Sequence, residues 1–175
     1  MAGRRHNGLP PRGTRGMGTL GGRLASHTLI GLDTPVFIYH LEAHPMYLSL
    51  TRELLAGVEM GKWTAITSTV TLMELTVHPW RLDRPAIARA YEMLLVHFPH
   101  LILADVTRDV ARQAAQLRAR YRLRPADALQ VATALVHEAT AFVTNDRRLS
   151  RLSPIIEVII LDDFAPSAAS LGSPQ

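Results

Sequence analysis

Apolar and polar residues follow two different periods along the chain. Short apolar runs bounded by Gly, Pro or charged residues are typical of buried strands, whereas apolar residues spaced three or four apart are typical of helices packed on one face. The predicted strands are residues 29–32, 63–69, 100–105, 141–146 and 155–161. The predicted helices are residues 45–61, 69–79, 83–98, 107–121 and 125–139, with a helical turn at 146–152.

The order of these elements predicts an α/β fold. Because strands alternate with helices, we expect a three-layer domain with a mostly parallel sheet of about five strands flanked by helices. With 175 residues, 47% of them hydrophobic, the chain is long enough for one well-cored domain and short for two. We place this domain at residues 27–164, after a disordered leader at 1–26 and before a flexible tail at 165–175.

The positive charge of the chain is concentrated in the leader. Of the 19 Lys and Arg residues, five precede the first acid, Asp33, which leaves 14 to face 15 acidic residues. The leader is also rich in Gly and Pro and has no hydrophobic periodicity, which is typical of disorder. It could act as an RNA-contacting tail or a transit-like segment, or arise from a start codon placed too early, with Met17 as the later start.

The sequence has no cysteine and no apolar run long enough to span a membrane, and both facts exclude classes of protein. The chain has no cysteine, so it has no disulfide, thiolate metal site or Cys nucleophile, which fits a reducing compartment such as the cytoplasm. Its longest apolar runs are of strand length, far below the ~20 residues that a membrane span needs. We therefore expect a soluble, cytoplasmic protein.

Four acidic residues occupy positions that face the carboxyl edge of a parallel sheet or the helices beside it. Asp33 ends the first strand, in "TLIGLDTPVFIYH", and Asp146 follows the fourth, in "VTND". Asp127 lies in the first turn after Pro125. Ligands of open α/β sheets bind at this edge. Each Asp also has a purely structural interpretation, as a helix cap or as a charge that favours a helix N-terminus.

The fourth acid, Glu74, lies in a helix with many apolar residues, "VTLMELTV". Apolar neighbours on both sides leave it little solvent, and no Lys or Arg lies within one turn. A buried carboxylate without a partner costs several kcal/mol or becomes protonated. A divalent cation held jointly with Asp33, Asp127 and Asp146 resolves this problem, and Mg²⁺ or Mn²⁺ prefers such oxygen ligands.

Four segments, in this order, resemble the motifs of one family. They are "LDTPVFIYHLE", "TSTVTLMEL", "LRPADALQVATAL" and "FVTNDRRL", and they span most of the predicted domain. The chain is similar to PIN-domain ribonucleases, in particular the toxin arm of VapBC-type toxin–antitoxin modules. It departs from the family pattern at Pro35, where Ser or Asn is common, and the departure leaves the acids intact.

The resemblance implies a site, an activity and partners. Asp33, Glu74, Asp127 and Asp146 would be the catalytic and metal-binding acids, with Thr144 and Asn145 as supporting residues. The activity would be Mg²⁺- or Mn²⁺-dependent hydrolysis of RNA phosphodiester bonds, which leaves a 5′-phosphate and a 3′-hydroxyl. The partners would be an RNA substrate, a small cognate antitoxin and a second copy of the chain.

Arginines flank two of the proposed ligands and could hold the RNA backbone. They are Arg118, Arg120, Arg122 and Arg124 before Pro125, and Arg147, Arg148 and Arg151 after Asp146. The alternative is that they are ordinary solvated helix ends. We assign His40 and His44 to the surface because a third metal ligand is missing, and Trp63 and Trp80 to packing.

Other functions fit less well. A haloacid-dehalogenase-type phosphotransferase needs a second Asp two residues after the first, where this chain has Pro35. A response-regulator receiver needs a Lys late in the sheet, and the only Lys is Lys62. The stronger alternative is a catalytically silent PIN-like module that binds RNA or a partner without cutting it.

Overall fold

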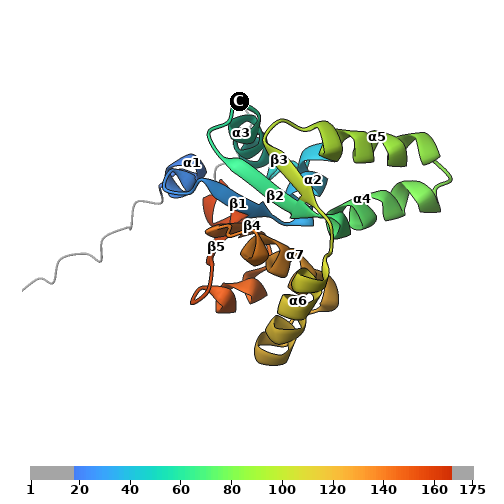
Figure 1. The fold of residues 1–175 in the computed structure, drawn as a ribbon. Coiled ribbons are helices and arrows are strands. Elements are labelled where there is room, and N and C mark those ends of the chain that lie inside the picture. Colours follow the sequence, from blue (N-terminus) through green and yellow to red (C-terminus); the bar gives the residue numbers. More distant parts are fainter. Residues whose placement is uncertain (1–17, 167–175) are drawn as a thin grey trace, which may run out of the picture.

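A computed structural model describes residues 18–166 of the chain (Figure 1). Five parallel strands form one sheet in the order β3-β2-β1-β4-β5. The strands are β1 (Leu29–Leu32), β2 (Thr64–Ser68), β3 (Leu101–Ala104), β4 (Ala141–Thr144) and β5 (Glu157–Ile160). The predicted α/β fold with a parallel sheet is confirmed, although most of the strands are shorter than predicted.

Helices cover both faces of this sheet. They are α1 (Leu20–Leu24), α2 (Thr34–Leu41), α3 (Leu48–Glu59), α4 (Thr69–Arg81), α5 (Pro85–His97), α6 (Arg108–Tyr121) and α7 (Pro125–Val136), followed by the 3₁₀ turns η1 (Arg147–Leu152) and η2 (Leu161–Phe164). Within residues 18–166, no helix is long and apolar enough to cross a membrane. The sequence analysis did not predict α2 as a helix, although it recognised Asp33 as a cap for the segment that follows.

Successive side chains of each strand point to two separate cores, as the period of two requires. Ile30, Leu32 and Val143 pack with residues of α1 to α5, whereas Ile66 and Phe142 pack with residues of α6, α7 and η1. The three layers that the sequence predicts are therefore present.

Gly31, in the middle of β1, allows α7 to lie against the sheet. A Cβ atom at this position would be 2.6 Å from Cδ2 of Phe142 and 2.8 Å from Cβ of Ala134, which belongs to α7. Both distances are too short for non-bonded carbon atoms. The absence of a side chain at Gly31 therefore lets the C-terminal part of α7 pack closely against the middle of β1.

The strand order reverses between β1 and β4. From β1 the chain builds outward through β2 to β3, then returns to place β4 on the other side of β1. At such a switch point the connections leave in opposite directions, and ligands of open α/β sheets bind outside the carboxyl ends of the strands there. Asp33 and Asp146 follow the two strands at this point.

The domain begins earlier than the sequence analysis predicts. Residues 20–24 were placed in a disordered leader, but they form α1, and its Leu20 and Leu24 are 1% and 0% exposed in the core. Trp63 donates from Nε1 to the carbonyl of Leu24 at 3.0 Å. The prediction of disorder is wrong for this stretch, because two leucines four residues apart give even a short Gly-rich helix one apolar face. Residues 1–17 and 167–175 lie outside the described part of the chain.

Helices α4 and α5 form an antiparallel pair that extends beyond the sheet (Figure 1). The predicted end of α4 at Pro79 is two residues too early, since the helix continues to Arg81. Trp80, on this last turn, is 57% exposed, so its assignment to packing is wrong. The assignment of Trp63, which is 6% exposed, is confirmed.

Candidate active site

A cavity of about 260 Å³ lies at the carboxyl ends of β1 and β4. It is lined by Asp33, Thr34, Pro35, Ile38, Glu74, Ala126, Asp127, Gln130 and Asp146. All four acids singled out in the sequence are therefore on the wall of one cavity, although they come from four separate segments.

Asp33 is the most deeply buried of the four, with 8% of its surface exposed. Its Oδ1 accepts the backbone N–H of Thr34 at 2.9 Å, which caps α2, and its Oδ2 accepts the Thr144 hydroxyl at 2.6 Å. Burial raises the pKa of Asp33 to about 6, against the lowering effect of these two hydrogen bonds. The charges of Asp127 and Glu74 make a smaller contribution to the same rise in pKa. Asp33 is thus both a helix cap and a member of an acidic group.

Glu74 is half-buried, so the prediction that it has little solvent is wrong in part. Its neighbours Met73 and Val77 are 55% and 38% exposed, because α4 extends beyond the sheet. The partner that the sequence analysis sought is a hydroxyl: Thr34 Oγ1 donates to Glu74 Oε2. This contact is neutral, and it leaves the negative charge of Glu74 uncompensated by any cationic side chain among residues 18–166.

Asp127 lies in the first turn of α7, as predicted, and is half-buried. Burial raises its pKa, and the negative charge of Asp146 raises it further. Arg148 and Arg124 act in the opposite direction. The main effect on this carboxyl group therefore comes from removal of water, with a second contribution from repulsion between acids.

Asp146 differs from the other three acids because it has a cationic partner. Its carboxylate accepts from Arg148 Nε at 2.9 Å and from Nη2 at 2.5 Å, and Oδ1 also accepts the Arg148 backbone N–H, which caps η1. The hydrogen bond from the Arg148 side chain holds the pKa of Asp146 below its usual value. A metal ion that binds both oxygens of Asp146 has to displace the guanidinium group of Arg148.

The two residues that the resemblance implied as supporting lie in different surroundings. Thr144 is fully buried; it donates to Asp33 and accepts the backbone N–H of Asp146 at 3.1 Å, so it connects two of the acids. Asn145 instead donates to the Tyr39 hydroxyl at 3.3 Å and accepts the Asp162 N–H at 2.9 Å. The Asn145 amide thus joins β4 to α2 and η2.

The seven arginines proposed as RNA contacts are all exposed. Two of them, Arg124 and Arg148, are close enough to the acids to lower the pKa of both Asp127 and Asp146. Arg147 pairs with Asp162 and Asp163. Arg151 donates to the carbonyls of Arg148 and Tyr121. The remaining three are Arg118, Arg120 and Arg122, near the end of α6.

Three aromatic rings pack together at the end of α2, a feature that the sequence analysis missed. The Tyr39 ring lies 4.5 Å from that of Tyr47 and 4.9 Å from that of His44, between centroids. His44 is therefore half-buried against two tyrosines, and the expectation that it is a surface residue is wrong in part.

Three further side chains beside the acids were not recognised in the sequence. Thr34, Thr71 and Gln130 are buried, and hydrogen bonds connect them to one another and to Glu74. Gln130 lies one turn after Asp127 on α7, within the apolar stretch "ALQVATAL". A large polar side chain on an otherwise apolar helix face is the signal that could have identified it.

The oxygen-rich, acidic wall suits a hard divalent cation better than any other ligand class. Burial and repulsion from neighbouring acids oppose the ionisation of Asp33 and of Asp127. A bound cation would favour the ionised form of both. However, in the part of the chain that the structure describes, no three Asp, Glu or His side chains lie close enough to hold one ion together. Ion binding by three acids therefore requires side-chain movement, above all of Asp146 away from Arg148.

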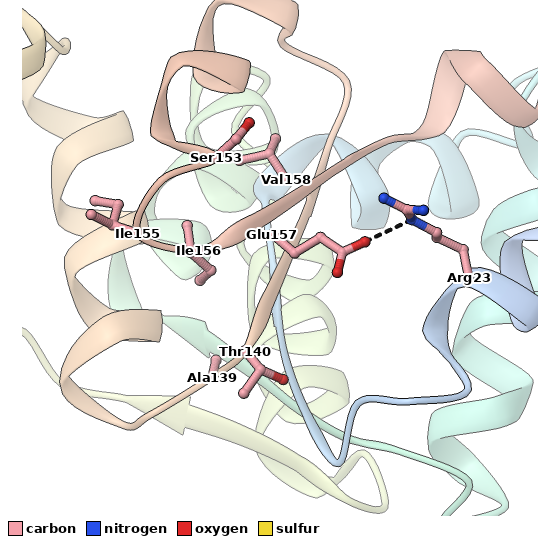
Figure 2. A pocket seen from close by; sticks show the side chains of 8 residues that line it. All are labelled: Arg23, Ala139, Thr140, Ser153, Ile155, Ile156, Glu157 and Val158. Carbon is pink, nitrogen blue, oxygen red and sulfur yellow. Dashed lines mark ion pairs between the residues drawn. The ribbon is translucent and has the colours of Figure 1, made fainter.

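A larger cavity, of about 570 Å³, lies at the opposite, amino-terminal edge of β4 and β5 (Figure 2). Arg23 points across it to Glu157, with Nε 2.6 Å from Oε1. His27 Nε2 lies 3.2 Å from the other oxygen of Glu157. The acid in this cavity is thus already paired with Arg23.

The comparisons with known proteins agree with this architecture. A toxin-antitoxin complex from Klebsiella pneumoniae has 20% identity and a TM-score of 0.57, and the match covers 77% of this chain and 97% of that chain. VapBC2 from Rickettsia felis, bound to a DNA fragment from its promoter, has 17% identity and a TM-score of 0.61, with 76% and 98% covered. FitAcB from Neisseria gonorrhoeae has 19% identity and a TM-score of 0.57, with 77% and 98% covered.

These identities are low, so the three structures support the fold alone. No curated protein sequence matches the chain significantly. The family model of the PIN domain matches residues 30–153, which is more than half of the chain and contains all four acids of the cavity. The chain therefore belongs to the PIN domain family.

Proposed function

We propose that this protein is a Mg²⁺- or Mn²⁺-dependent endoribonuclease. The observation that carries the proposal is the cavity at the switch point of the sheet, where Asp33, Glu74, Asp127 and Asp146 converge from four segments. Structural roles account for single acids, such as the caps formed by Asp33 and Asp146. They do not account for the gathering of four in a place where the pKa of two is raised.

The four carboxylates would hold the ion or ions. When bound, a divalent ion lowers the pKa of a water molecule and offsets the charge that builds on the phosphate during hydrolysis. Asp33 is the most firmly placed ligand, because Thr34 and Thr144 hold its two oxygens. Asp146 is the least available ligand, because Arg148 occupies its carboxylate.

Arg124 and Arg148 are the residues best placed to hold the RNA backbone. Both are exposed, and both act electrostatically on Asp127 and Asp146. A phosphate at the mouth of the cavity would lie within reach of these cations, whose contacts position nucleic acid without reading its sequence. The substrate class is single-stranded or looped RNA, and the reaction leaves a 5′-phosphate and a 3′-hydroxyl.

We further propose that the protein acts in the cytoplasm as the toxin of a toxin–antitoxin pair. Support comes from the similar structures, one of which is a toxin-antitoxin complex and one of which is VapBC2 bound to promoter DNA. The partners would be a cognate antitoxin and a second copy of the chain. This proposal can be tested by co-purification with the product of an adjacent short gene, the expected antitoxin. Cleavage activity should appear when the antitoxin is removed.

The test of the nuclease is RNA cleavage with Mg²⁺, with Mn²⁺ and with excess EDTA. We expect cleavage with either ion, none with EDTA, and none from Asp33→Asn purified in the same way. Asp105→Asn is the matched control, since Asp105 also follows a strand at the carboxyl edge of the sheet but is exposed and does not line the cavity. Undiminished cleavage in EDTA, or by Asp33→Asn, would rule the mechanism out. RNA binding without cleavage would support a silent binding module instead.

A further inference from the structure

A buried row of hydrogen bonds runs behind the acidic cavity and ends at Glu74. Its members come from β1, β2, α2, α4 and α7. Four of its polar side chains are fully or almost fully buried: Thr71 is 0%, Thr67 2%, Thr34 3% and Gln130 3% exposed. In such surroundings each hydroxyl or amide proton has only a few possible acceptors. The direction of every bond can therefore be worked out.

The row begins at the backbone of β1. Thr67 Oγ1 donates to the carbonyl of Leu32 at 3.0 Å, which uses its only proton. Thr71 Oγ1 lies 2.7 Å from Thr67 Oγ1, so in this pair Thr71 is the donor. The single hydroxyl proton of Thr71 is then also used.

The amide group of Gln130 determines the direction of the remaining hydrogen bonds. Its Nε2 donates to Thr71 Oγ1 at 2.6 Å and to Thr34 Oγ1 at 2.9 Å, which uses both amide protons. Thr34 therefore accepts from Gln130, and its own proton goes to Glu74 Oε2. No proton is then left for the 3.1 Å contact between the hydroxyl oxygens of Thr34 and Thr71. If the amide were reversed, its oxygen would compete with Glu74 for the Thr34 proton.

The orientation of the Gln130 amide leaves one of its own polar atoms without a hydrogen bond. Gln130 Oε1 is buried and has no hydrogen-bond partner among the described residues. An unsatisfied buried acceptor is destabilising, and an apolar side chain of the same size would avoid it. The benefit of the amide lies in its two donated protons.

We infer that Gln130 is a positioning residue for Glu74, acting through the hydroxyl group of Thr34. The inference rests on the proposed function, in which Glu74 is a metal ligand. This role requires no contact between Gln130 and the ion or the RNA. It fixes the direction of the Thr34 proton, which holds one oxygen of Glu74 at the cavity wall.

The first test compares Mn²⁺ binding by calorimetry in wild type and Gln130→Met. Met keeps the length of the side chain and removes both donors, so we expect about tenfold weaker Mn²⁺ binding, as for other residues that orient metal ligands. Thr133→Val is the matched control. Thr133 lies one turn later on α7, is 1% exposed, and its hydroxyl bonds only to the carbonyl of Leu129 in the same helix. The control should bind Mn²⁺ as wild type does.

The second test asks whether Gln130 acts through Thr34. Thr34→Val should also weaken Mn²⁺ binding, and adding Gln130→Met to it should cause little further loss, because the two residues share one path. Losses that multiply in the double variant would overturn the inference, as would unchanged Mn²⁺ affinity in Gln130→Met.

A measurement on wild type does not depend on the folding of any variant. In the NMR spectrum both side-chain amide protons of Gln130 should exchange slowly and show NOEs to the β-protons of Thr34 and Thr71. Absence of these NOEs would show the amide reversed and overturn the inference. If wild type bound no Mn²⁺, the proposed function would fail, and the NMR result would still decide the direction of the hydrogen bonds.

Discussion

The hydroxyl of Thr144 donates to Oδ2 of Asp33 at 2.6 Å and thereby joins the ends of the two strands between which the sheet changes direction. The same hydroxyl accepts the backbone N–H of Asp146. One side chain thus fixes the distance between the first and the last acid of the candidate site. The energetics of this acidic group lead to most of the predictions that follow.

Asp33 should make the metal-free protein less stable as the pH rises from about 4 to about 6. An Asp side chain in water has a pKa of 3.8, and burial raises the pKa of Asp33 to about 6 in the folded protein. The folded state therefore binds the proton more tightly than the unfolded state, and the stability gained from this proton is lost as the pH rises through the folded pKa. The full difference corresponds to roughly 3 kcal/mol. Urea unfolding of wild type and Asp33→Asn between pH 4 and 8 measures this change in the free energy of unfolding. Wild type should gain stability relative to the variant at low pH, and parallel curves would contradict the prediction.

Asp127→Asn should abolish cleavage and leave the metal-free protein at least as stable as wild type at neutral pH. The substitution removes a half-buried charge that Asp146 repels, at nearly constant shape. Added Mn²⁺ should stabilise wild type, since it binds only the folded state, and stabilise the variant much less. Four melting curves, for the two proteins with and without Mn²⁺, provide the test. A variant that melts well below wild type without metal would show that Asp127 mainly stabilises the N-terminus of α7 through its charge.

Arg148→Gln should have opposite effects on the two ligands of the site. Release of Asp146 from its ion pair should strengthen Mn²⁺ binding about two- to fivefold. This factor corresponds to the free energy that an exposed ion pair usually contributes. Loss of a phosphate-binding cation should weaken RNA binding. Calorimetry and fluorescence anisotropy measure the two affinities. Arg112→Gln is the control, because Arg112 forms a similar exposed pair with Asp109 on α6. A parallel loss of both affinities would mean that Arg148 only supports the structure.

Leu24→Ala should destabilise the protein by about 2 to 5 kcal/mol, the usual range for a fully buried leucine. Removal of residues 1–25 should cost more, since it also deletes Leu20 and the carbonyl that accepts from Trp63. Leu82→Ala is the control: Leu82 is 48% exposed, and its loss should cost under about 1 kcal/mol. Chemical denaturation gives the three values. An unaffected truncated protein would show that α1 contributes little to the fold.

The sequence was sufficient for features that depend on local pattern. Asp33 and Asp146 were recognisable because each follows a buried strand, and the parallel sheet follows from the alternation of strands and helices. Glu74 was identified for a reason that is only partly correct, since the predicted burial assumed that α4 is covered along its whole length.

The missed features depend on residues far apart in the chain. The contact of Thr34 with Glu74 spans 40 positions and that of Gln130 with Thr34 spans 96. A periodicity analysis sees Thr34 as one small polar residue after an acid. Leu20 and Leu24 were hidden for a different reason, because the Gly and Arg residues around them outweigh two leucines in any average of composition.

The position of β1 at the centre of the sheet has a consequence for protein synthesis. Asp33 leaves the ribosome early, but its partner Thr144 follows 111 residues later, and β4 has to insert beside β1 before the two meet. A nascent chain that ends before β4 carries at most three of the four acids, and its β1 lacks one neighbour. The acidic cavity therefore forms only when nearly the whole domain has been translated, and a prematurely terminated chain carries no complete site.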